Sequence, residues 1–239
     1  MKSWNVRGFF HRFNAHTNEK FSVIAVNSTL GNKFSHFWEK AVHRVAADGA
    51  ANRLMNYFGT EAHFPPHVIV GDFDSLNATA RQFYENQKTN FIRVEDQDST
   101  DLHKAIDLFL PNSEYSAFKE PIYVFGGLGG NLSQAFGNVH CLYHYKKTLP
   151  NQIFLISPDN VGCLLEAGTH KILGEKGDFC SFIPLGSSAE VTSKQLKYPM
   201  DKLKLSFDTI VSTSNSFVED EITVETNEPI FFLLDASKH

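Results

Sequence analysis

A short apolar run leads into two acidic residues in the sequence His67-Val68-Ile69-Val70-Gly71-Asp72-Phe73-Asp74-Ser75. The apolar run at 67–70 predicts a buried strand, and apolar residues at helical spacing follow at 78–87. The same order of strand, polar loop and helix recurs through the first two-thirds of the chain. This alternation is typical of a parallel sheet with helices on both faces.

The neighbouring segments extend this pattern. We expect further strands at 21–26, 43–47, 91–94, 122–125 and 153–156, and helices at 34–41, 50–58, 102–110 and 132–143. Beyond about Pro158, short strand-like runs alternate with turn residues, at 171–173, 178–184, 190–193, 209–213, 221–226 and 230–234. Such spacing predicts an antiparallel sandwich. We therefore expect an α/β protein with an extension at 1–20, a Rossmann-like parallel-sheet domain at 21–157 and an antiparallel β-sandwich domain at 158–239.

The composition argues against several classes of protein. The chain has 239 residues and a formal net charge of −5, which disfavours a nucleic-acid-binding surface. Its apolar runs are shorter than the roughly 18 residues that a membrane helix needs. Three widely spaced cysteines without a Cys-x-x-Cys pair favour a reducing compartment, so we expect a cytoplasmic protein. Basic and aromatic residues within 1–18 make a mitochondrial targeting segment the less favoured alternative.

Acidic residues and glycines gather directly after four of the predicted strands. In chain order they are Asp48, then Asp72 and Asp74, then Glu95, Asp96, Asp98 and Asp101, then Gly126, Gly127, Gly129 and Gly130. Ligands of open parallel sheets bind beyond the carboxyl ends of the strands. Loops are polar in any protein, but seven acids at one edge of a sheet exceed what that tendency explains.

Two of these acids suggest a metal site. Asp72 and Asp74 are two residues apart, which places both carboxylates on one side of an extended chain. Their mutual repulsion favours a cation between them, and Mg²⁺ prefers carboxylate and phosphate oxygens. Thr100 can cap the helix that follows it, which would place Asp101 in the first turn. Asp98 and Asp101 are expected to face the same cleft.

The glycine-rich segment 126–131 comes just before a predicted helix. Glycines allow the backbone to approach phosphates closely, and a helix N-terminus offers free N–H donors. The spacing matches neither the dinucleotide fingerprint nor the Walker loop. The segment alone is therefore a weak indication of phosphate binding, which the neighbouring acids strengthen.

His140 and His144 are four residues apart on one predicted helix. The glutamate of a His-Glu-x-x-His motif is missing, and no third ligand is evident in the sequence. A packed or solvated pair is the simpler interpretation, with metal binding as the less favoured one.

The ordered set of motifs resembles the thiamin pyrophosphokinase family, with the animal-type enzymes most similar. The stretches that carry the resemblance span about residues 21–235, and they are 47–54, 71–75, 96–101, 126–130, 210–215 and 223–226. The resemblance implies transfer of a pyrophosphoryl group from ATP to the hydroxyethyl oxygen of thiamine, with release of AMP. It also implies a magnesium-dependent homodimer that holds thiamine where the subunits meet.

The resemblance also implies roles for particular residues. The metal-binding and catalytic carboxylates would be Asp72, Asp74, Asp98 and Asp101. The nucleotide site would be lined by Asp48, Gly127, Gly129, Gly130 and Asn131. The thiamine site would be formed by Gln97, Tyr198, Ser212, Ser214 and Asn215. The first domain would therefore bind nucleotide and metal, and the second would bind thiamine and form the dimer.

Three positions depart from the family pattern. Ala50 stands where glycine is usual, and Tyr198 stands where tryptophan is frequent. Asn131 replaces an arginine that commonly follows the glycine loop, which removes a strong phosphate partner. Lys104 and Arg53 are the candidates for a substitute cation.

Two other functions remain alternatives. The strand followed by Asp72 and Asp74 resembles haloacid-dehalogenase-like phosphatases, in which Asp72 would be the nucleophile. That interpretation leaves the segment 96–101 and the whole second domain without a role. The departure at Asn131 favours instead a non-catalytic homologue that binds thiamine or a nucleotide.

Overall fold

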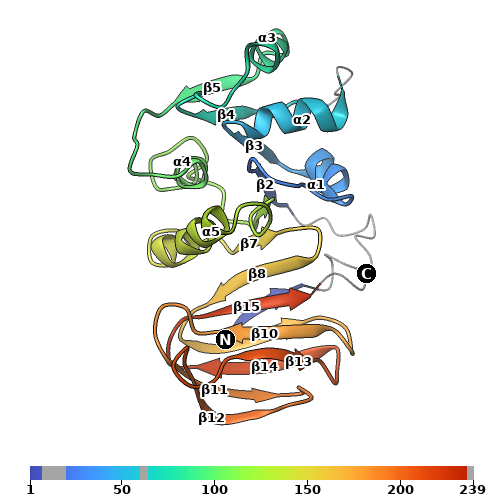
Figure 1. The fold of residues 1–239 in the computed structure, drawn as a ribbon, viewed down its shortest axis with the longest axis vertical. Coiled ribbons are helices and arrows are strands. Elements are labelled where there is room, and N and C mark those ends of the chain that lie inside the picture. The colour runs from blue at the N-terminus through green and yellow to red at the C-terminus, as the bar shows by residue number, and fades with distance from the viewer. Residues whose placement is uncertain (7–19, 60–63, 236–239) are drawn as a thin grey trace. The chain divides into compact units, whose positions relative to one another are not determined.

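Six strands of the first two-thirds of the chain lie in one parallel sheet, in the order β7-β6-β2-β3-β4-β5 (Figure 1). Their bounds are β2 (Ser22–Ala25), β3 (His43–Ala47), β4 (Val68–Gly71), β5 (Asn90–Arg93), β6 (Ile122–Phe125) and β7 (Ile153–Ile156). Every residue of β2, β4, β6 and β7 is buried, which explains their continuous apolar sequences. The computed structural model describes residues 1–6, 20–59 and 64–235.

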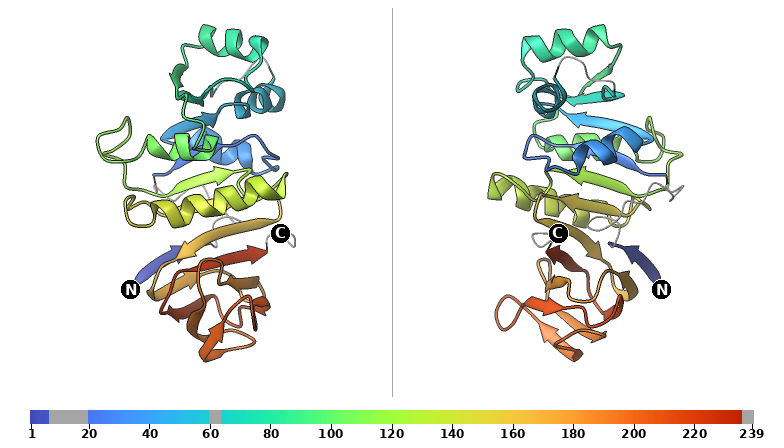
Figure 2. Two further views of the ribbon diagram at one scale, coloured as in Figure 1. Left: turned by 60° about the vertical axis from the view of Figure 1, so that its left-hand side comes forward. Right: turned by 90° about the vertical axis from the view of Figure 1, so that its right-hand side faces the viewer.

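Helices cover both faces of this sheet. They are α1 (Phe34–Lys40), α2 (Ala50–Phe58), α3 (Ala78–Asn86), α4 (Asp101–Asp107) and α5 (Leu132–Tyr145). Figure 1 shows α1 and α2 on one side of the strands and α4 and α5 on the other, and the turned views of Figure 2 show the same layers. The strand order reverses at β2, which pairs with β3 on one side and with β6 on the other. Open α/β sheets bind their ligands at such a switch point.

The remaining strands belong to the other unit, in which they pair in two groups. One has the order β1-β9-β14-β11-β12, with bounds Lys2–Asn5, Gly168–Leu173, Glu221–Thr226, Ala189–Lys194 and Met200–Leu205. The other pairs β13 (Ser212–Ser216), β10 (Phe179–Ile183), β15 (Ile230–Asp235) and β8 (Asn160–Leu165). All of these pairs are antiparallel except β1 with β9.

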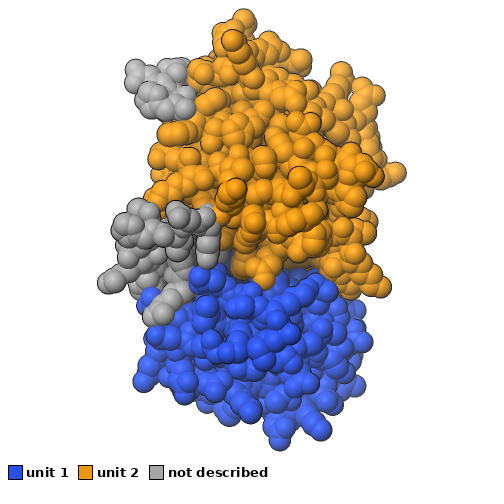
Figure 3. All heavy atoms as spheres, turned by 180° about the vertical axis from the view of Figure 1, so that it is seen from behind, with its two compact units in different colours: residues 1–18, 159–239 blue, residues 19–158 orange. Residues whose placement is uncertain are grey.

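The chain thus divides into two compact units, which Figure 3 colours separately. One comprises Glu19–Pro158, and the other comprises Met1–Asn18 with Asp159–His239. Together they make a mixed α/β fold. Among the described residues, none of the helices combines the length and the apolar character needed to cross a membrane.

The second unit differs from the sequence predictions at several strands. Lys2–Asn5 form β1 inside the segment expected to be an extension, of which residues 7–19 lie outside the described residues. Strands β8 and β12 were not predicted. Four of the six β12 residues are exposed, so this edge strand has no alternating apolar pattern. The strand expected at 209–213 is wrong by about three residues, because Ile210 is exposed and β13 begins at Ser212.

Candidate functional site

Three carboxylates meet at the carboxyl ends of β3 and β4. Asp48 directly follows β3, and Asp72 and Asp74 follow β4. One oxygen from each of the three lies within 4.8 Å of the others, the only such group of potential metal ligands among the described residues. These three residues form the acidic group. The parallel register of β3 and β4 brings the ends of the two strands to the same edge.

Asp48 has a strained backbone and a buried carboxyl group without hydrogen bonds to the described residues. Its side chain is fully buried, neither carboxylate oxygen has a hydrogen-bond partner among the described residues, and its φ is +40°. Burial, and then the charges of Asp101 and Asp72, raise the pKa of Asp48 to about 7. Gly71 makes room for it, since a Cβ there would lie 2.7 Å from the Asp48 Cβ. Strain and unpaired polar atoms of this kind accumulate at functional sites.

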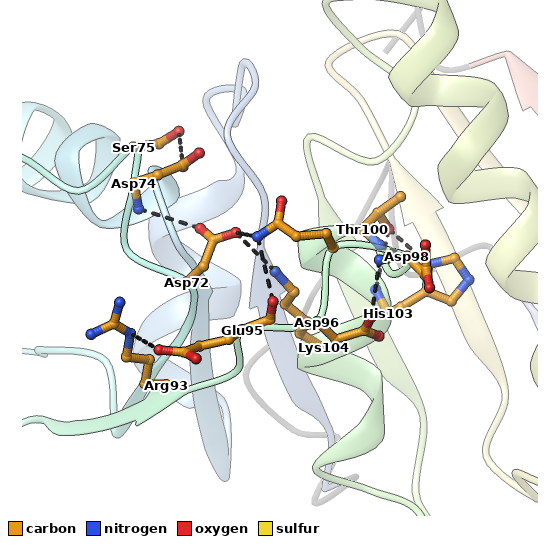
Figure 4. Close-up of polar contacts among 11 residues, drawn as sticks. Asp72, Asp74, Ser75, Arg93, Glu95, Asp96, Asp98, Thr100, His103 and Lys104 are labelled. Atoms are coloured by element: carbon orange, nitrogen blue, oxygen red, sulfur yellow. Dashed lines mark hydrogen bonds and ion pairs between the residues drawn. The ribbon is translucent and has the colours of Figure 1, made fainter.

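Asp72 is stabilised as an anion. Its Oδ1 accepts a hydrogen bond from the backbone N–H of Asp74 at 3.3 Å, and its Oδ2 accepts one from Gln97 Nε2 at 3.1 Å. Lys104 Nζ lies 3.2 Å from the same Oδ2 (Figure 4), and the Lys104 side chain is only 2% exposed. The Asp74 N–H and then Lys104 lower the pKa of Asp72 to about 2. Asp72 is therefore ionised throughout the neutral range.

Asp101 and Asp98 occupy different places around the start of α4. Thr100 caps this helix through its hydroxyl, which puts Asp101 in the first turn as expected. Burial, and then the charges of Asp72 and Asp74, raise the pKa of Asp101, so Asp101 is within electrostatic reach of the acidic group. Asp98 lies apart from Asp72 and Asp74 in Figure 4 and is not in the acidic group. Its backbone N–H donates to Asp96 Oδ1 at 2.9 Å.

A pocket of about 80 Å³ lies at the switch point between β2 and β6. Its lining comes from the loops after these strands, from the start of α4 and from the first half of α5. It comprises Val26, Asn27, Ser28, Thr100, Asp101, Leu102, Gly126, Gly129, Gln134 and Asn138. Ser28 Oγ is buried and has no hydrogen-bond partner among the described residues. The pocket thus offers an unsatisfied hydroxyl and a glycine loop to a ligand, and Asp101 links it to the acidic group.

Two residues of the glycine loop have positive φ angles and close contacts that favour glycine. Gly126 has a φ of +83°, and a Cβ there would lie 3.1 Å from Ser28 Cβ. Gly130 has a φ of +75°, and a Cβ there would lie 2.8 Å from Ser28 Oγ. Both positions therefore require glycine. Gly127 contributes its carbonyl, which accepts a hydrogen bond from Asn138 Nδ2 at 2.9 Å.

Asn131 has a structural task in this loop. Its Oδ1 accepts from the Ser133 backbone N–H at 2.9 Å and from the Ser133 hydroxyl at 2.7 Å, so it caps α5. The two candidate substitute cations lie at different places. Lys104 pairs with Asp72, whereas Arg53 Nε donates at 2.7 Å to Oδ1 of Asn27, which lines the pocket.

The residues assigned to thiamine in the second unit form one local arrangement. The Asn215 side chain is buried and holds the Tyr198 backbone from both sides, since its Oδ1 accepts from the Tyr198 N–H at 3.0 Å and its Nδ2 donates to the Tyr198 carbonyl at 2.8 Å. The Tyr198 residue itself is 59% exposed. Ser212 and Ser214 lie on β13 together with Asn215. Gln97, also assigned to thiamine, lies in the other unit and bonds Asp72.

The structure brings only part of the predicted metal set together. It groups Asp72 and Asp74 with Asp48 rather than with Asp98. Ser28 and Asn27, which follow β2, were missed. Both residues directly follow a predicted parallel strand. The rule that ligands bind beyond the carboxyl ends of such strands could therefore have found them.

Comparison with known proteins relates this site to a family. Residues 34–154 match the family model "Thiamin pyrophosphokinase, catalytic domain", and residues 169–231 match "Thiamin pyrophosphokinase, vitamin B1 binding domain". A thiamine pyrophosphokinase of Oryza sativa subsp. japonica is 33% identical over 225 residues, which are 86% of this chain and 82% of the relative. One from Arabidopsis thaliana is 31% identical over 93% of this chain and 88% of its own.

Solved structures agree in fold. Thiamin pyrophosphokinase from Candida albicans superposes with a TM-score of 0.85 at 22% identity, covering 98% of this chain and 92% of that chain. The catalytic-domain match contains the acidic group and the glycine loop, and the B1-binding match contains Tyr198 and β13. This chain therefore belongs to the thiamin pyrophosphokinase family.

Proposed function

We propose that this enzyme transfers a pyrophosphoryl group from ATP to the hydroxyl oxygen of thiamine, releasing AMP, at the carboxyl edge of its parallel sheet. The observation that carries the proposal is the position of Asp101. Asp101 lines the pocket at the β2–β6 switch point and also interacts electrostatically with all three members of the acidic group. A nucleotide in the pocket would thus place its phosphates next to the carboxylates.

Phosphoryl-type transfer depends mainly on positioning and charge stabilisation. The unsatisfied Ser28 hydroxyl and the backbone N–H groups at the start of α5 would hold phosphate oxygens. After the Asp74 N–H, Lys104 also lowers the pKa of Asp72, and its buried side chain pairs with the Asp72 carboxylate. Arg53 donates a hydrogen bond to Asn27, which lines the pocket, and it would take over the role of the missing arginine.

The acidic group fits Mg²⁺. The orphaned oxygens of buried Asp48, together with the oxygens of Asp72 and Asp74 within 4.8 Å, make an all-oxygen donor set. We infer that these three residues hold the metal and that Asp101 stands beside it, with Asp98 more distant. When bound, the metal would neutralise charge that develops on the phosphate oxygens.

For thiamine, we infer a site that uses Tyr198, Ser212, Ser214 and Asn215, and the family resemblance assigns Gln97 to thiamine as well. The exposed Tyr198 ring offers a face to the thiazolium cation. Asn215 would act by positioning Tyr198, because its amide is occupied by the Tyr198 backbone. The serine hydroxyls on β13 would supply hydrogen bonds to the pyrimidine.

Several wider features belong to the same proposal. The parallel-sheet unit would be a Rossmann-like nucleotide-binding domain, and the other unit would be a β-sandwich that forms a homodimer in the cytoplasm. Exposed apolar side chains of that unit support dimerisation, since Phe207 is 65% and Ile210 49% exposed. Three free, buried cysteines are consistent with a reducing compartment.

One assay tests the function against its alternatives. The chain is incubated with thiamine, ATP and Mg²⁺, and the products are separated by chromatography. We expect thiamine diphosphate and AMP in equal amounts. Thiamine-independent release of inorganic phosphate would favour the phosphatase alternative, and binding without product would favour the non-catalytic homologue.

A further inference from the structure

Three histidine rings gather on the surface formed by α4 and α5, outside the acidic group and the pocket lining. His140 and His144 lie one turn apart on α5, and His103 faces them from α4. The ring centroids are 5.5 Å apart for His103–His140, 5.5 Å for His103–His144 and 6.0 Å for His140–His144. The structure thus supplies the third imidazole that the sequence did not reveal.

We propose that His103, His140 and His144 form a binding site for a transition-metal ion with the ligand preference of Zn²⁺. In a tetrahedral site with Zn–N bonds of about 2.0–2.1 Å, the centres of imidazole ligands lie about 5 Å apart. The observed separations are close to that value. Imidazole nitrogens select Zn²⁺, Cu²⁺ or Ni²⁺ over Mg²⁺, which separates this site chemically from the acidic group.

His103 is already oriented as a ligand would be. Its Nδ1 lies 2.8 Å from Thr100 Oγ1 and 3.5 Å from the Sγ of buried Cys141 (Figure 4 shows His103 beside Thr100). With the proton on Nδ1, the ring donates to the Thr100 hydroxyl and leaves the Nε2 lone pair for a metal. Ligating histidines are commonly held through their other nitrogen in this way. The longer contact from the Thr100 backbone N–H to Nδ1, 3.4 Å, would then be given up.

His140 and His144 are free to complete the site. Both are exposed, and within the described part of the chain their rings have aromatic contacts but no hydrogen bond or ion pair. The three rings do not yet place their nitrogens within 4.8 Å of one another, so the two exposed rings must rotate on binding. Asp107, one turn after His103, adds a negative charge that acts on His103 and so favours a cation.

Calorimetric titration of the untagged full chain with ZnCl₂ tests this site. The buffer contains saturating Mg²⁺, so that the acidic group is occupied and the signal reports the imidazoles. We expect saturable Zn²⁺ binding that His103→Gln, His140→Gln and His144→Gln each weaken about tenfold or more, the cost of one lost ligand. Glutamine at position 103 restores the usual partner of a Thr100 capping box, so α4 keeps its cap.

A matched control is His36→Gln, which removes a histidine from α1 and leaves all three rings in place. This variant should bind Zn²⁺ as tightly as the unchanged chain. Affinity unaltered by His103→Gln would overturn the proposal, because the pair on α5 would then bind alone. An equal loss in the His36 variant, or the absence of saturable binding, would overturn it as well.

Discussion

At the level of single residues, Asp48 combines a cost in stability with a role in the site. Its pKa is about 7 in the folded chain, against an ordinary value of 3.8, mainly because it is buried. Between these two values the folded state keeps a proton that the unfolded state has lost. Stability therefore falls as the pH rises from about 4 to about 7, and the full penalty persists above that.

The fall in stability with rising pH leads to the first prediction. Asp48→Asn should raise the free energy of unfolding at pH 8 by on the order of 2 kcal/mol and should leave it unchanged near pH 3. Asparagine tolerates the positive φ at this position, so the backbone is preserved. Thermal melts of both proteins at the two pH values measure the difference. Asp201→Asn, on exposed β12, is the control and should change neither melt.

The same residue predicts a response to metal. Mg²⁺ should raise the melting temperature of the unchanged chain, because it binds the folded state only, and should raise that of Asp48→Asn much less. Thiamine diphosphate formation should fall about 100-fold in the variant. An undiminished metal response would show that Asp48 is not a ligand.

Lys104 predicts a change in pH dependence. Lys104→Met removes a positive charge that lowers the pKa of Asp72 and also that of Asp101, which burial already raises, so both pKa values should rise. In the variant, kcat/KM should therefore begin to fall at a higher pH on the acid side, and it should be reduced about tenfold or more at neutral pH. Lys171→Met, which breaks an exposed ion pair with Glu221, serves as the control. Acid limbs that coincide in the two variants would contradict the assignment.

The sequence identified candidate residues more readily than it predicted which of them lie together in space. Asp72 and Asp74 follow a strand at fixed spacing, so their meeting was predictable. Asp98 follows a strand as well, but the loop from Glu95 to Thr100 turns it away, and no periodicity describes a loop. Ser28 is noticeable only once its hydroxyl is seen to be buried without a partner.

At the level of elements, the parallel strands were predicted to within about two residues. Burial explains this best for β2, β4, β6 and β7, in which every residue is buried. Strand β1 shows why other elements were missed. It pairs with β9, more than 160 residues away in the chain, and such a pairing leaves no local pattern. Strand β12 exposes most of its residues and therefore reads as a loop.

The start of α5 gives the prediction that belongs to this scale. Asn131→Arg removes the cap of α5 and should lower the free energy of unfolding by about 1 kcal/mol. The new guanidinium restores a phosphate partner, so the KM for ATP should fall in the same variant. Asn131→Asp is the matched control, because it keeps the cap and adds a negative charge. It should retain stability and raise the KM for ATP. A higher KM in Asn131→Arg would mean that the loop binds phosphate in another geometry.

At the level of the whole molecule, charge is unevenly distributed. The formal net charge is −5, from 22 basic and 27 acidic residues. Seven of the acids follow three neighbouring strands, in the connecting loops or at the start of the next helix, and they are Asp48, Asp72, Asp74, Glu95, Asp96, Asp98 and Asp101. The rest of the chain carries 22 basic and 20 acidic residues, a net charge of +2. The acidity is therefore a property of one edge of one sheet.

This distribution predicts how salt acts on the two substrates. Thiamine is a cation, so the acidic edge should attract it, and ions at about 0.1 M screen such attraction beyond about 10 Å. We expect kcat/KM for thiamine to fall with ionic strength more steeply than kcat/KM for ATP. Glu95→Gln should flatten the thiamine dependence, because Glu95 is an exposed member of these loops. Glu190→Gln, on β11 of the other unit, removes the same charge and should leave the slope unchanged. Equal slopes in the two variants would show that net charge, rather than its concentration at this edge, governs the approach of thiamine.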